Sequence, residues 1–204
     1  AFWADVDVSG FGDIFYQAYD FQSSNVNTTF KESLESTVAA YFNLTQFKAL
    51  WALKITWDNV PPFTSGIYNS KAYWNTQVNN TNTFQVILVT DGIYSFALIL
   101  FDDGGMKWIF NALPTFHLPK MGYHSGIPSA RNVNNFPAFN DPQTDTSVSI
   151  KQRYRPDQYI GYNTGKKGRW AYRLDSNSQS TINSRLQCLQ WYYKEEIPYW
   201  LSST

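Results

Sequence analysis

Two apolar runs on either side of Asp91-Gly92 constrain the fold of this chain more than any other feature. They read TFQVILVT and IYSFALILF, and they are rich in Val, Ile and Phe. These residue types favour strands. Asp-Gly supports the positive φ angles of a type I′ turn, whose twist matches that of the flanking strands. The pattern therefore predicts a β-hairpin with a two-residue turn.

Other segments predict further strands. Residues 49–60, ALWALKITWDNV, are rich in Trp, Leu and Ile, and RWAYRL at 169–174 alternates in polarity. The chain opens with AFWADVD, which also alternates, and the Gly-rich SGFGD and the run DIFYQAYDF follow it. We expect the opening strand to form a hairpin with DIFYQAYDF. DDGG at 102–105 predicts another turn.

One segment has the period of a helix. Apolar residues recur at helical spacing over residues 30–42, and Thr29 with Glu32 fits a capping box. Residues 111–165 are rich in Pro, Asn and Gly, which predicts long loops between short strands. The expected fold is mainly β, an antiparallel β-sandwich with one covering α-helix at about residues 30–42 and long loops.

The charge balance argues against two classes of partner. Lys+Arg and Asp+Glu both number 16, so the chain lacks the basic field that holds a phosphate backbone. We therefore expect no nucleic-acid partner. The longest apolar runs fall far short of the ~20 residues of a membrane helix, so no membrane span is expected within the chain.

Three N-glycosylation triplets indicate a secretory route. They begin at Asn27, Asn43 and Asn79. Such triplets also arise by chance in a chain rich in Asn and Thr. Aromatic residues make up 18% and charged residues 16% of the chain, which is typical of a β-rich globular protein with an uncharged polar surface.

The opening strand carries two carboxylates, Asp5 and Asp7, on one of its sides. They form a candidate calcium site, to which Asp13, Asp20 or loop carbonyls would add ligands, since calcium takes about six to eight oxygens. The alternative is that both carboxylates lie at the wet end of the strand or accept from backbone amides of the Gly-rich turn. A hydrolase that uses the pair is a remote third alternative, because nothing nearby would separate the two pKa values. No other cofactor is expected.

Three aromatic residues in a polar loop, Tyr68, Tyr73 and Trp74, are candidate contacts for sugars or proteins. The alternative is that they fold back into a local core. His117 and His124 are seven residues apart, which is not a zinc-ligand spacing.

Several blocks resemble the NIDO domain, an extracellular module first described in nidogen and also found in alpha-tectorin and membrane mucins. They read FWADVD, LWALKITWDNV, NTFQVILVTDGIYSFALILF, KWIF and GRWAYRLD, and the resemblance spans residues 1–175. It implies an architectural role without catalysis. It also implies that Ala1 is a processing or fragment boundary. SGIPSARNVNNFPAFN departs from the Gly-rich stretch usual in the family. If this loop carries partner specificity, relatives do not predict the partner.

The tail CLQWYYKEEIPYWLSST resembles the opening of an AMOP domain, a cysteine-rich extracellular module. This implies a linker at 176–185, an AMOP-like start at 186–204, and a disulfide from Cys188 to a cysteine outside this chain.

Together these features predict a non-catalytic extracellular module for cell adhesion or for matrix or mucus-coat assembly. Its expected partners are extracellular proteins or glycans, with self-association among the outcomes. The alternative is a lectin-like glycan-binding module that uses the loop aromatics.

Overall fold

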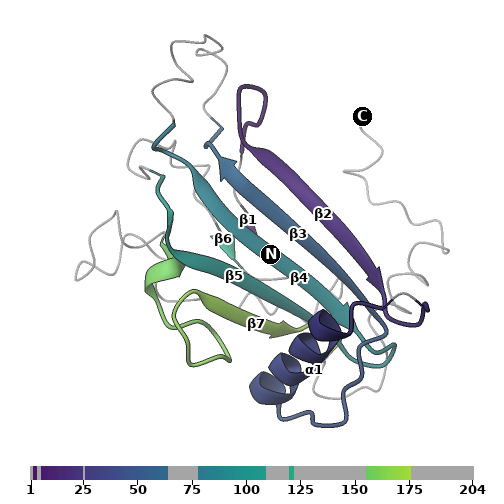
Figure 1. Ribbon diagram of the computed structural model, residues 1–204. Coiled ribbons are helices and arrows are strands. Elements are labelled where there is room, and N and C mark those ends of the chain that lie inside the picture. The colour runs from purple at the N-terminus through teal and green to yellow at the C-terminus, as the bar shows by residue number, and fades with distance from the viewer. Residues whose placement is uncertain are drawn as a thin grey trace, which may run out of the picture.

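The computed structural model describes residues 2–3, 6–24, 26–63, 78–108, 120–121 and 155–175. A five-stranded antiparallel sheet forms its centre, with the strand order β2-β3-β4-β5-β7. Figure 1 shows the helix α1 packed across one end of this sheet. The strands are β2 (Asp13–Asp20), β3 (Trp51–Val60), β4 (Asn82–Thr90), β5 (Ser95–Met106) and β7 (Arg169–Arg173).

Helix α1, Thr28–Phe42, confirms the expected covering helix within two residues. Its N-cap is Asn27, whose side chain accepts a hydrogen bond from the Phe30 amide at 3.0 Å, so the cap expected at Thr29 was two residues too late. Asn43 ends the helix in the left-handed conformation, at φ 54°. Leu34 and Val38 are the buried residues of the helix.

The strands β4, β5 and β7 of the sheet are buried on both faces. On the face that α1 covers, the helix face, a core forms from Phe21, Leu34, Val38, Phe47, Ala49, Ala52, Ile87, Val89, Phe96, Leu98 and Ala171. On the opposite face a second core forms from Val60, Phe84, Val86, Ala97, Ile99, Phe101, Met106, Trp108, Trp170 and Tyr172. Because side chains alternate along each strand, β4 and β5 supply both cores. Their continuous apolar runs follow from this burial on two sides.

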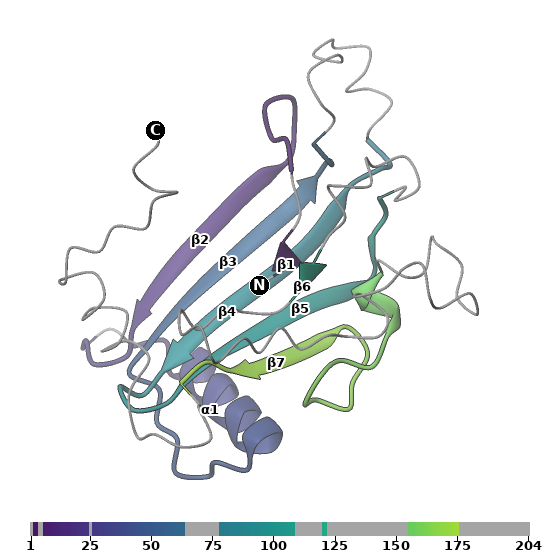
Figure 2. The ribbon, with the colours of Figure 1, turned by 180° about the vertical axis from the view of Figure 1, so that it is seen from behind.

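The opening strand lies on the opposite face rather than in the five-stranded sheet. Strand β1 (Phe2–Trp3) pairs antiparallel with β6 (Lys120–Met121). Figure 2 shows this pair in front of the sheet, with α1 behind it. Pairing of the first strand is confirmed, but its expected hairpin with DIFYQAYDF is wrong, since β2 pairs with β3. The result is a mainly β fold with material layered on both sheet faces.

Two expected turns also differ from the structure. Thr90 pairs with Ser95, so four residues join β4 to β5 rather than two. Asp91 is the reason: its carboxylate accepts from the amides of Ile93 at 2.9 Å and Tyr94 at 2.6 Å, which closes a wider loop. DDGG is not a turn between strands either, because β5 continues through it to Met106 with a register shift against β4.

Candidate interaction surfaces

The outer edge of β7 is covered by the chain itself. Residues 159–168 fold beside β7, where the Ala171 amide donates to the Tyr162 carbonyl at 3.0 Å. The Thr164 hydroxyl donates to the Arg169 carbonyl at 2.5 Å. Both β7 groups point away from β5, so the loop satisfies backbone groups that an edge strand leaves unpaired. The loop fits closely, since a Cβ on Gly161 would lie 1.6 Å from the Arg169 oxygen.

A buried carboxylate anchors the start of this cover. The short helix η3, Pro156–Gln158, holds Asp157, which is almost fully buried. Asp157 accepts from the Gly104 amide at 3.0 Å and from the Arg155 guanidinium at 2.6 Å. The hydrogen bond that Arg155 donates to Asp157 raises the pKa of Arg155 above its ordinary value. These contacts tie η3 to the DDGG segment of β5.

The opposite edge, β2, is open. Among the residues that the structure describes, only β3 pairs with it. Three consecutive apolar side chains lie largely in solvent: Ile14 is 45%, Phe15 56% and Tyr16 78% exposed. Consecutive residues point to opposite faces, so this apolar surface wraps around the edge. Edges that avoid pairing are short or carry Lys or Pro, whereas β2 has eight residues and neither of these types.

The backbone of β2 offers a regular row of outward groups. Phe21 donates to the Leu50 carbonyl at 3.0 Å, which marks a hydrogen-bonded pair in the register of β2 and β3. That register runs without a shift from Asp13 to Asp20. Odd-numbered residues of β2 therefore bond to β3. The N–H and C=O groups of the even-numbered residues, among them Ile14 and Tyr16, point away from the sheet.

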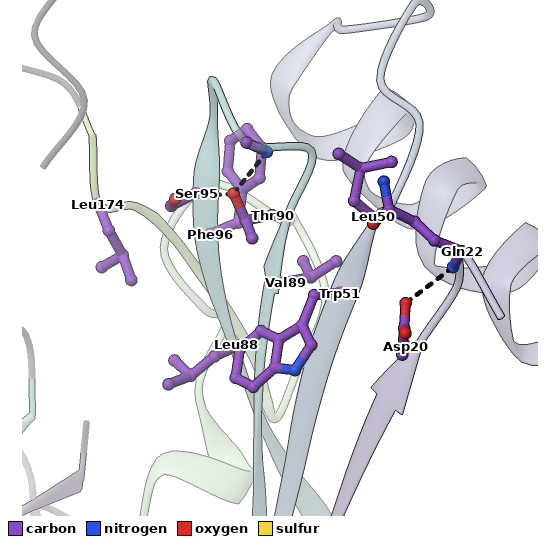
Figure 3. A pocket seen from close by; sticks show the side chains of 11 residues that line it. Asp20, Gln22, Leu50, Trp51, Leu88, Val89, Thr90, Ser95, Phe96 and Leu174 are labelled. Atoms are coloured by element: carbon purple, nitrogen blue, oxygen red, sulfur yellow. Dashed lines mark hydrogen bonds between the residues drawn. The ribbon is translucent and has the colours of Figure 1, made fainter. Parts of the chain in front are cut away.

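A pocket lies where β2 ends and β3 begins. It encloses about 820 Å³, and Trp51, which is 40% exposed, stands at its centre (Figure 3). Leu88 and Leu174 line one side, and Asp20 and Gln22 line the other. The rest of the lining is Leu50, Val89, Thr90, Gly92, Ser95 and Phe96.

The polar groups of the pocket differ in what they already bind. The Thr90 hydroxyl donates to the Tyr94 carbonyl at 2.7 Å and accepts from the Ser95 hydroxyl at 3.1 Å. One oxygen of Asp20 accepts from the Gln22 amide at 2.9 Å. The second oxygen of Asp20 and the side-chain amide of Gln22 have no partner among the described residues. Both groups belong to the lining of the pocket.

The profile of the nidogen-like (NIDO) domain matches residues 1–176. The chain belongs to the nidogen-like domain family. It is 33% identical to mucin-4 of Homo sapiens over 202 residues, which covers 98% of this chain and 3% of mucin-4. It is 26% identical to alpha-tectorin of Gallus gallus over 197 residues, with coverages of 94% and 8%. The chain thus spans less than a tenth of these relatives. No solved structure matches it.

This nidogen-like domain is an extracellular module, either secreted or part of an ectodomain. Within the described ranges, no helix is long and apolar enough to span a membrane. The family match confirms the resemblance that the sequence blocks indicated. The AMOP-like reading of 186–204 stays a prediction, because those residues lie outside the described part of the chain.

In this nidogen-like domain, Asp7 accepts a hydrogen bond within the turn that follows it. One Asp7 oxygen accepts from the Ser9 amide at 2.9 Å, as the alternative to a calcium site expected. Asp5 lies outside the described residues. Asp13 and Asp20 stand at opposite ends of β2 and cannot both join Asp7. No group of three or more carboxylate, histidine or cysteine side chains that could hold a metal occurs among the residues described.

The three glycosylation triplets begin at exposed positions. Asn27 caps α1 through its carbonyl oxygen, which leaves the amide nitrogen, where a glycan attaches, outside that bond. Asn43 caps the other end of α1, and Asn79 lies in a turn before β4. These positions are compatible with glycans, whose presence stays a prediction.

Several candidates lie outside the described residues: Tyr68, Tyr73, Trp74, His117, His124 and Cys188. Sequence reasoning missed the two surfaces described above. Trp51 and the Ile14-Phe15-Tyr16 run were assigned to strands, and a strand pattern does not show that its side chains stay in solvent. The available signal was in DIFYQAYDF, where apolar residues occupy both faces of one short strand.

Proposed function

We propose that this nidogen-like domain is a non-catalytic module for cell adhesion or for matrix or mucus-coat assembly through protein–protein contacts. The observation that carries the proposal is the open edge of β2, with its apolar side chains and outward backbone groups. An exposed edge of this kind adds a strand from another chain, since main-chain hydrogen bonds supply affinity and side chains supply specificity. The extracellular family supports the same role.

Binding of the domain to defined extracellular ligands tests the proposal. We would coat beads with the domain and measure their binding to purified basement-membrane proteins, to a reconstituted mucus gel and to cell surfaces. The expected result is saturable binding that Tyr16→Lys reduces at least tenfold, because a charge is then placed on the edge. Ile93→Lys is the matched control, since Ile93 is 66% exposed in the loop between β4 and β5. Absence of binding to all three, or equal loss in both variants, would contradict the proposal.

The pocket around Trp51 supports a second function, glycan binding. An exposed indole offers a flat apolar face to a sugar ring, and the carboxylate of Asp20 and the amide of Gln22 offer partners for hydroxyl groups. The glycan contacts proposed from sequence were Tyr68, Tyr73 and Trp74, whereas the residues proposed here are Trp51, Asp20 and Gln22.

A glycan array separates the second function from the first. We expect saturable binding that Trp51→Ala abolishes, that Trp51→Phe partly retains, and that Tyr16→Lys leaves unchanged. An array without binding, or binding that survives Trp51→Ala, would rule out a glycan site in this pocket.

A further inference from the structure

We propose that β2 pairs antiparallel with β2 of a second copy of the chain, about a two-fold axis at Tyr16. The pairing joins two five-stranded sheets into one. The inference rests on the proposed function, because it names a second copy as the occupant of the open edge.

Hydrogen bonding restricts how two β2 strands can meet. Only even-numbered residues have outward N–H and C=O groups, so even residues of one copy must stand opposite even residues of the other. This requires a two-fold axis perpendicular to the sheet, which keeps both helix faces on the same side. With Tyr16 on the axis, the two Tyr16 residues exchange backbone hydrogen bonds, and Ile14 stands opposite Ala18.

The acidic ends of β2 agree with this register. If the strands paired end to end, Asp13 of each copy would stand opposite Asp20 of the other, and like charges directly opposite are destabilising. That arrangement also places even residues opposite odd ones, so their hydrogen bonds fail. In the register centred on Tyr16, Asp13 stands opposite Tyr19 instead.

Lys54 supplies the complementary charge. Its ammonium lies 5.6 Å from the centre of the Tyr19 ring, on the helix face. It makes a second cation–π contact with Phe30, but it has no carboxylate partner among the described residues. Asp13 likewise has no described partner. The proposed register brings Asp13 of the second copy to the Tyr19 position, within reach of Lys54, and the two-fold axis forms this contact twice.

Apolar contact and net charge favour a second copy over other occupants. Tyr16 would meet its own symmetry mate on the face opposite the helix, and aromatic cross-strand pairs stabilise antiparallel sheets. The formal net charge of the chain is zero, so two copies do not repel each other. The edge formed by β2, with Lys54 of β3 beside it, is thus self-complementary in hydrogen bonds, in charge and in apolar surface.

Cysteine cross-linking tests the register in the full chain carrying Cys188→Ser. Directly opposite, hydrogen-bonded residues have Cα atoms about 5.5 Å apart, which a disulfide spans. Tyr16→Cys is therefore expected to form a covalent dimer on mild oxidation. Ala18→Cys is the matched control: its two copies would stand four residues out of register, roughly 13 Å apart, and should not link. Equal linking of both variants, or linking of neither, would overturn the register.

A charge swap tests the ion pair by sedimentation equilibrium. Asp13→Lys and Lys54→Asp should each raise the dimer dissociation constant roughly tenfold, because each places like charges together twice. The double variant should return to within about threefold of wild type. Asp20→Lys is the control, since Lys54→Asp should not rescue it. A domain that stays monomeric at millimolar concentration, or a double variant without rescue, would overturn the inference.

The outcomes also separate this inference from the proposed function. A monomeric domain that still binds matrix proteins or mucus through the Tyr16 edge would refute self-pairing alone. A β2-linked dimer that binds none of them would refute the adhesion role alone. A Tyr16 amide already protected from hydrogen exchange in the dilute monomer would show that the chain covers its own edge, which refutes the inference.

Discussion

The two edge strands of the sheet differ: the chain covers the outer edge of β7, whereas the edge of β2 is open among the described residues. At β7 the chain folds back, and Tyr162 and Thr164 bond to the outward backbone groups of the strand. At β2 no described residue does the same, and three consecutive apolar side chains, Ile14 to Tyr16, face solvent. Single exposed apolar residues need no explanation, but three in a row on an unpaired edge do. The covered edge of β7 accounts for stability within the fold, and the open edge of β2 supports the proposal of contact with another chain.

The largest loss of stability is expected where the loop at residues 159–168, which covers the edge of β7, contacts that strand. Gly161→Ala places a Cβ against the Arg169 carbonyl, so the loop must move away, and the free energy of unfolding should fall by about 3 kcal/mol or more. Urea unfolding measures this. Gly165→Ala is the control, because Gly165 has open space around it and only its positive φ opposes a side chain, at a cost of about 1 kcal/mol. Similar losses in both variants would show that the fit at Gly161 is unimportant.

The second-largest loss of stability is expected at Asp157, which anchors the start of this loop. Asp157→Ala leaves the Arg155 guanidinium and the Gly104 amide without their acceptor, and we expect a loss of about 2 kcal/mol. The folded-state pKa of Arg155 is raised, so the pair's contribution is fully present at neutral pH and is lost only when a strongly alkaline solution passes the raised pKa. The loss caused by Asp157→Ala should therefore be constant across the neutral range, and a loss that varies with pH there would contradict this account.

Loss of the Thr164 hydroxyl, in the same loop, should lower the free energy of unfolding by less. Thr164→Val removes the donor to the Arg169 carbonyl and should cost about 1 kcal/mol in thermal or urea unfolding. Thr164→Ser keeps the hydroxyl and should stay close to wild type. If Val stays close to wild type and Ser destabilises, the methyl group rather than the hydrogen bond holds the loop.

The smallest effect on stability is expected at the open edge. Tyr16→Lys replaces a side chain that is 78% exposed, so the free energy of unfolding should change by less than about 0.5 kcal/mol. Association should nevertheless weaken. A variant that unfolds as easily as Gly161→Ala would show that β2 is part of the stabilising core after all, and the contrast between the two edges would not hold.

The sequence predicted where the strands and the helix lie better than it predicted which strands pair. The strands at 49–60 and 169–174 and the helix near 30–42 lie where their patterns placed them, because period and composition are local properties. The pairing of β1 with β6 could not be read in this way. It joins residues more than a hundred positions apart, and periodicity shows that a face is buried without showing what buries it.

The candidate surfaces were less predictable than the fold. The family resemblance correctly indicated an extracellular domain, but it does not tell an edge strand from an inner one. Ile14 and Trp51 belong to residue types that are usually buried, and their exposure depends on which strands lie beside them. The sequence left Asp7 between a calcium site and a turn, and the hydrogen bond from the Ser9 amide places its carboxylate in the turn.

The direction of the strands has a mechanical consequence. In this antiparallel order β2 and β7 run the same way at opposite edges, so the chain enters β2 and leaves β7 at diagonally opposite corners of the sheet (Figure 1). Tension applied between Asp13 and Arg173 would act along the strands. Rows of hydrogen bonds would then be loaded together in shear rather than opened one at a time. The sheet would therefore resist extension in this direction until a whole row of hydrogen bonds yields.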